Sequence, residues 1–97
     1  TGSIALSGSV DAHGSWTMTH ALTSTKPARA PQPGAFVIVL YGHDGMELYR
    51  QELGVHHANH DDFAVWAVRV PVPGAAVAAV RVWDESGSLI LDEALAL

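Results

Sequence analysis

The chain has 97 residues, 48% of them hydrophobic and 15% charged, so it carries enough apolar surface for one folded core and disorder is excluded. Ten acidic residues against five basic ones give a formal net charge of −5, which excludes nucleic-acid binding through a basic patch. The absence of cysteine excludes disulfides and thiolate chemistry, and no apolar run reaches the length of a membrane span.

The first third of the chain predicts a β-hairpin followed by a crossing segment. Apolar and small polar residues alternate over 4–10 and again over 16–22, with a turn at 11–14 between them. Because strand side chains alternate between faces, Ile4, Leu6 and Val10 are expected to face a core. Three prolines within 23–34 forbid helix and central strand, so this segment is predicted to carry the chain to a second sheet.

The middle third predicts a second hairpin. Residues 36–41 are apolar at every position, which is typical of a strand in the middle of its sheet, covered on both faces. The pair Asp44-Gly45 is a strong turn signal. The charges of the return strand, 46–53, are typical of a sheet edge. The polar, His-rich residues 54–62 are predicted to form an irregular loop.

The last third predicts three more strands, over 63–70, 77–83 and 88–95, separated by turns at 71–74 and 84–87. Arg69 and Arg81 are expected to point to solvent. A bulge or a strand end is expected near Asp92–Glu93, because Glu93 breaks the alternation. The side chains expected to point inward in these strands are Trp66, Val68, Val70, Val80, Val82, Leu89 and Leu91.

These elements predict one all-β domain spanning residues 1–97. Seven strands, one long crossover and no helix favour an immunoglobulin-like (fibronectin III-like), seven-stranded antiparallel Greek-key sandwich. Because the sequence begins without Met and without a signal-peptide pattern, we expect a domain excised from a longer chain.

Three tryptophans offer candidates for core and surface roles. Alternation places Trp16 and Trp66 in the interior and Trp83 on the outward side of its strand, beside Arg81. We expect Trp83, Arg81 and Tyr49 to be exposed contacts for a neighbouring domain or another protein. Since aromatic rings also stack on sugars, a carbohydrate-binding module remains an alternative.

The cluster of His and Asp at 56–62 holds the candidate metal ligands. Imidazole and carboxylate groups bind zinc, copper and nickel, so His56, His57 and His60 with Asp62 or His43 form a candidate site. The alternative is a solvated loop whose polar groups satisfy their own backbone. The spacing is not that of a zinc-protease helix, because His57 stands where a catalytic Glu is required.

No motif for catalysis is present. The sequence has no Gly-x-Ser-x-Gly, no glycine loop for phosphates and no dinucleotide fingerprint. We therefore expect no enzymatic activity and no cofactor.

The turns and core positions form a pattern that is spread over most of the chain. Its segments are Gly8-Ser9-Val10-Asp11, Gly14-Ser15-Trp16, Leu40-Tyr41-Gly42-His43-Asp44-Gly45, Leu48, Phe63, Val70-Pro71-Val72-Pro73 and Asp84-Glu85-Ser86-Gly87. This pattern resembles accessory sandwich domains of secreted bacterial proteins, in which an immunoglobulin-like module often follows a catalytic domain, including zinc-peptidase domains. The resemblance implies a non-catalytic attachment or interaction module outside the cytoplasm, and the lack of cysteine favours the fibronectin-like subclass.

Overall fold

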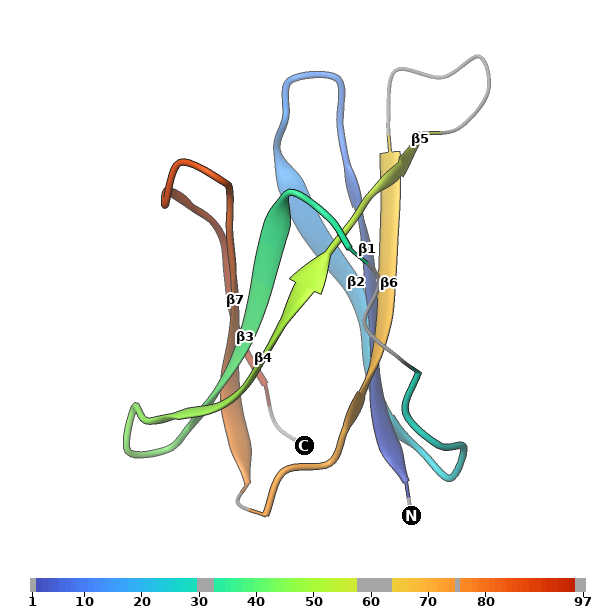
Figure 1. Ribbon diagram of the computed structural model, residues 1–97, viewed down its shortest axis with the longest axis vertical. Helices are drawn as coiled ribbons and strands as arrows, with labels where there is room; N and C mark the ends of the chain where they lie inside the picture. The colour runs from blue at the N-terminus through green and yellow to red at the C-terminus, as the bar shows by residue number, and fades with distance from the viewer. Residues whose placement is uncertain (1, 30–32, 58–63, 75, 96–97) are drawn as a thin grey trace.

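The computed structural model describes residues 2–29, 33–57, 64–74 and 76–95 and shows two four-stranded antiparallel sheets facing each other (Figure 1). Sheet A has the strand order β2-β1-β6-β5, and sheet B has the order β4-β3-β7-β8. The strands are β1 (Ser3–Val10), β2 (Trp16–Ser24), β3 (Phe36–Gly42), β4 (Glu47–Leu53), β5 (His56–His57), β6 (Ala64–Pro71), β7 (Val77–Trp83) and β8 (Leu89–Ala94).

The all-β prediction is confirmed, and each of the seven expected strands is present. The eighth strand, β5, has only two residues and pairs with the start of β6. It lies in the segment predicted to be an irregular loop, so that prediction is wrong at His56–His57. Within the described residues there is no helix, and so none of the kind that could cross a membrane.

The order of the strands confirms several finer expectations. The wholly apolar β3 lies between β4 and β7, and the charged β4 lies at an edge of sheet B. The proline-rich segment between β2 and β3 connects sheet A to sheet B. In sheet A the first strand is central, because β1 pairs with β2 on one side and with β6 on the other.

The core lies between the sheets and consists of the side chains that alternation turns inward. An aromatic contact joins the two layers: the ring centroid of Trp16 lies 4.8 Å from that of Phe36 and 5.9 Å from that of Trp66. The buried members of the core are Ile4, Leu6, Ile38, Leu40, Leu53, Trp66, Val70, Val77, Val80, Val82 and Leu91.

Gly8 is the point where sheet A makes room for its largest core side chain. Gly8 lies opposite Trp66 across the β1–β6 ladder. A Cβ atom at this position would lie 2.8 Å from two atoms of the Trp66 indole and would also collide with the Thr17 carbonyl oxygen. Only glycine therefore lets the indole lie against β1.

One inward assignment is wrong, because a bulge changes the alternation of β8. Trp83 pairs with Leu89, but Val82 pairs with Leu91, so Ile90 is an extra residue on β8. Leu91 consequently faces the core and is 5% exposed, whereas Leu89 is 44% exposed. The bulge lies at Ile90 and not near Asp92–Glu93, where the alternative expectation of a strand end agrees with the end of β8 at Ala94.

Two hairpin turns share one design, Asp-x-x-Gly-Ser. In the first, Asp11 Oδ1 accepts hydrogen bonds from the backbone N–H groups of His13 and Ser15, each 2.9 Å long. The Ser15 bond, supported by His13, holds the pKa of Asp11 below its ordinary value of 3.8. Gly14 supplies the positive φ, 81°, that the turn requires.

The second such turn, 84–88, repeats this arrangement with an added hydroxyl. Asp84 Oδ1 accepts from Ser86 Oγ at 2.6 Å and from the N–H groups of Ser86 and Ser88 at 2.9 Å. These bonds, led by the Ser86 hydroxyl, lower the pKa of Asp84. Gly87, with a φ of 86°, occupies the position of Gly14.

The contact between Gly8 and Trp66 predicts that Gly8→Ala destabilises the protein by about 1–3 kcal/mol, through overpacking. Gly74→Ala is the matched control, because nothing lies within 4 Å of a Cβ atom at Gly74. Urea denaturation gives both free energies of unfolding. Equal stability of the two variants would contradict the close approach at Gly8.

The two Asp turns predict a loss of stability in acid. A folded-state pKa below the unfolded one stabilises the protein above the unfolded value near 3.8, and this stabilisation is lost as the pH falls through the lowered pKa. Between pH 7 and pH 2 the melting temperature of Asp11→Ala/Asp84→Ala should therefore fall less than that of the parent. Glu85→Ala is the control, and its melting temperature should fall as much as that of the parent. An equal fall in melting temperature in all three proteins would refute the prediction.

Candidate functional site

The outer face of sheet B carries an ordered group of charged and aromatic side chains, here called the Arg81 cluster (Tyr41, Arg81, Trp83 and Asp92). The guanidinium carbon of Arg81 lies 4.8 Å from the centroid of the Tyr41 ring, a cation–π contact. Arg81 Nε lies 3.4 Å from Asp92 Oδ1 without forming a hydrogen bond, so this contact is an electrostatic pairing. Both contacts fix the guanidinium on the central strand β7.

Trp83 lies on the same face of β7, as predicted for Trp83 and Arg81. The buried Val80 and Val82 face the core, which leaves Arg81 and Trp83 on the other side of the strand. Across the sheet Trp83 has Val37 and the exposed Leu89 as its register partners. An aromatic and aliphatic row therefore runs beside the paired guanidinium.

Tyr49, the third predicted contact, lies on the opposite face of the sheet. Its register partner is the buried Leu40, and its ring packs against the core. The phenol hydroxyl donates a 2.8 Å hydrogen bond to Gln51 Oε1, which satisfies the polar end of the side chain. Tyr49 is therefore half-buried and does not share a face with Trp83 and Arg81, and Tyr41 is the tyrosine that accompanies Arg81.

The candidate metal ligands are only partly within the described residues. His60 and Asp62 lie outside them, and His56 and His57 form β5. His43 lies in the β3–β4 turn, at the opposite end of the molecule from β5 (Figure 1). The described part of the chain contains no group of three potential metal ligands. A metal site in 56–62 stays a prediction, and His43 does not lie near β5.

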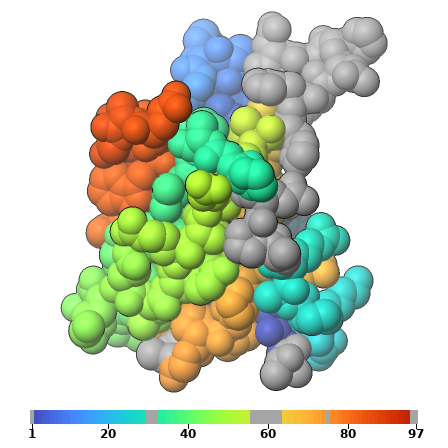
Figure 2. Space-filling model, viewed as in Figure 1, coloured from blue at the N-terminus to red at the C-terminus, as the bar shows by residue number. Residues whose placement is uncertain are grey.

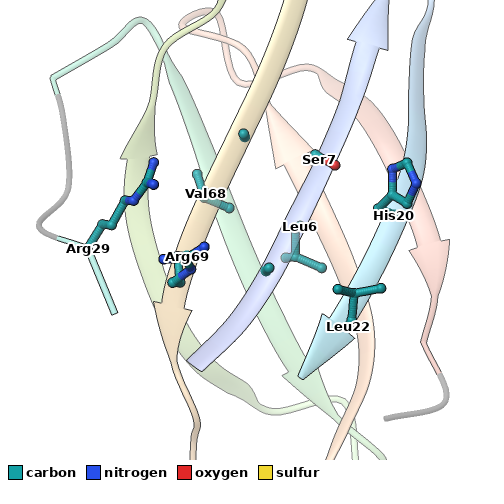
Figure 3. Close-up of a pocket in the computed structure, with 9 residues that line it drawn as sticks. Leu6, Ser7, His20, Leu22, Arg29, Val68 and Arg69 are labelled. Carbon is teal, nitrogen blue, oxygen red and sulfur yellow. The ribbon is translucent and has the colours of Figure 1, made fainter. Parts of the chain in front are cut away.

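The outer face of sheet A holds a feature that the sequence did not indicate, a depression of about 360 Å³, here called the trough (Figure 3). Two rows of register partners cross the sheet there, Leu22–Ala5–Arg69 and His20–Ser7–Ala67. The small side chains lie on the central strands and form the floor. Figure 3 shows His20 and Leu22 on one side of β1 and Arg69 and Arg29 on the other.

The segment after β2, residues 25–29, crosses the outer face of sheet A and is called the strap. Ser3 Oγ donates a 2.8 Å hydrogen bond to the Lys26 carbonyl oxygen, which places the strap over β1. The Arg29 N–H donates a 2.9 Å hydrogen bond to the Arg69 carbonyl oxygen on β6. Ser3 is buried beside the strap, Arg29 lines the trough, and Lys26 lies next to Ser3, outside the lining of the trough.

The two outer faces differ in charge. Strands β1, β2 and β6 contain no Asp or Glu, while three of the five basic residues lie on β6 or the strap. On sheet B, Arg50 Nη2 lies 2.7 Å from Glu47 Oε1, and this bond raises the pKa of Arg50. Among the described residues Arg29 and Arg69 form no such ion pair, so no described carboxylate neutralises the two guanidinium groups at the trough.

Comparisons of the chain with models of protein families, with curated proteins and with solved structures give no match.

Proposed function

We propose that the chain is a non-catalytic interaction module of a larger secreted or surface bacterial protein, and that it holds a neighbouring domain or a partner protein. The outer face of sheet B is the contact surface. The Arg81 cluster is the observation that carries this proposal. Tyr, Trp and Arg are the residue types that dominate the binding energy of protein interfaces, and here all three lie together on one face.

The cluster is held in place before any partner binds. Arg81 is on a central strand, its guanidinium contacts the Tyr41 ring, and its charge is balanced by Asp92. A side chain that is already ordered loses less conformational entropy on binding. A partner that covers Trp83 and Arg81 therefore gains contact area at low cost.

The fold supports an immunoglobulin-like, fibronectin-like relationship through sheet B. The order β4-β3-β7-β8 corresponds to the C′CFG arrangement of that class. The other sheet of that class has the strand order A-B-E-D, so its second strand, B, lies between strands A and E. In sheet A of this protein the first strand, β1, occupies that inner position. The proposed relationship therefore includes an exchange in the positions of the first two strands.

A protein partner is favoured over a glycan by where the aromatic rings lie. Sugar platforms need several rings on one exposed surface. Trp16 and Trp66 pack in the interior, which leaves Trp83 and Tyr41 on the outer face of sheet B. Two rings beside a paired guanidinium are typical of a protein contact.

Hydroxyl-radical footprinting of the complete encoded polypeptide and of the isolated 97-residue domain tests this function. Trp83 and Tyr41 should be modified several-fold more slowly in the complete protein, because a neighbour or partner covers them. Met46, exposed at the β3–β4 turn, is the internal reference and should react equally in both.

The double variant Arg81→Ala/Trp83→Ala in the complete protein is the matched test. It should restore fast modification of Tyr41, whereas Met46→Ala should leave Tyr41 protected. The proposal is overturned if Trp83 reacts equally fast in the isolated domain and in the complete protein. It is also overturned if the gene encodes no other domain and the domain binds no partner.

A further inference from the structure

We propose that the trough on the outer face of sheet A binds an acidic, extended polypeptide segment, whose carboxylates are held by Arg29 and Arg69. This surface is separate from the Arg81 cluster, because the two lie on opposite sides of the core. Figure 2 shows the strap (cyan) at the lower right, away from the β3–β4 turn of sheet B (light green) at the lower left.

The first observation behind this inference is the grouping of like charges. The hydrogen bond from the Arg29 N–H to the Arg69 carbonyl oxygen makes these two residues neighbours, and Lys26 lies on the same strap. Like charges placed side by side destabilise a sheet unless an anion lies between them. In a chain with a net charge of −5, three of five basic residues at one acid-free place indicate an anionic partner.

The second observation is an unsatisfied donor. Arg69 Nε is buried and has no hydrogen-bond partner among the described residues. A buried polar group without a partner is costly, so an acceptor supplied by a ligand stabilises the complex. A carboxylate suits this place because the planar guanidinium offers two parallel N–H groups to its two oxygens.

The shape and lining of the trough favour a polypeptide over other polyanions. Small side chains form its floor along β1 and β6, and Leu22, 53% exposed, adds an apolar contact. The described side chains that line the trough include no Trp, Tyr or Phe, the rings on which sugars and single-stranded nucleic acids most often stack. Three cationic residues are also fewer than the clusters of four or more that hold anionic membranes.

Fluorescence anisotropy with a labelled hexaglutamate peptide tests the inference, with hexaglutamine as the uncharged control. Hexaglutamate should bind saturably, more weakly as salt is added, and hexaglutamine should not bind. In Arg29→Gln/Arg69→Gln the affinity for hexaglutamate should fall about tenfold or more. The matched control Arg50→Gln/Arg81→Gln removes the same charge from sheet B and should bind nearly as well as the parent.

Two further measurements separate recognition from loss of folding. Arg69→Lys keeps the charge but loses the two parallel N–H groups, so its affinity for hexaglutamate should lie between those of the parent and the double variant. Arg29→Gln alone changes an exposed side chain, so loss of folding does not explain a weaker affinity in this variant. In amide NMR spectra the peptide should shift Ser7, Ala67 and Leu22 but not Tyr41 or Trp83. The inference is overturned if hexaglutamate does not bind, if both double variants weaken it equally, or if sulfate or oligogalacturonate binds as tightly as the peptide.

Discussion

The close contact between the Trp66 indole and the backbone of β1 at Gly8 sets the geometry of this protein. Because Gly8 has no side chain, the indole of Trp66, the largest core residue, can lie directly against the backbone of β1. Trp66 then packs against Trp16, and Trp16 reaches across to Phe36 of sheet B. The two layers are therefore joined by a continuous aromatic contact, around which the aliphatic residues of β3 and β7 close the core.

A core built by strict alternation leaves two outer faces, and the chemistry of these faces is different. On sheet B the two cationic side chains, Arg50 and Arg81, each lie against a carboxylate, and Arg81 also lies over the Tyr41 ring, with Trp83 on the same strand. On sheet A the strap brings further positive charge to strands that contain no acid. The first face suits a partner protein with an apolar contact surface, and the second suits an acidic one. A module with two such faces can join two parts of a larger assembly.

Local sequence patterns were sufficient to predict much of the fold. Alternation predicted the strands and the inward tryptophans, the wholly apolar run predicted the central place of β3, and the charges predicted the edge place of β4. Leu89 was misassigned because one extra residue, Ile90, lies between it and Leu91 in the ladder with β7, so Leu89 and Leu91 face opposite sides of the sheet. The face of Tyr49 could not be predicted from its residue type alone, because its ring packs against the core while its hydroxyl bonds to Gln51. The trough could not be predicted, because it needs Arg29, Ala5 and Arg69 to meet through strand order, which local pattern does not contain. The lack of acidic residues in 3–10, 16–24 and 64–71 was its only sequence signal.

The most direct measurement of this account is the free energy of unfolding of Trp66→Ala, by chemical denaturation, beside that of Trp83→Ala. Trp66 is 1% exposed and joins the sheets, so Trp66→Ala should lower the free energy of unfolding by about 3–5 kcal/mol. Truncation of the outward-facing Trp83 should lower it much less. If the Trp66→Ala protein unfolds at the same denaturant concentration as the parent, the indole is not the centre of the core, and the assignment of inner and outer faces is wrong.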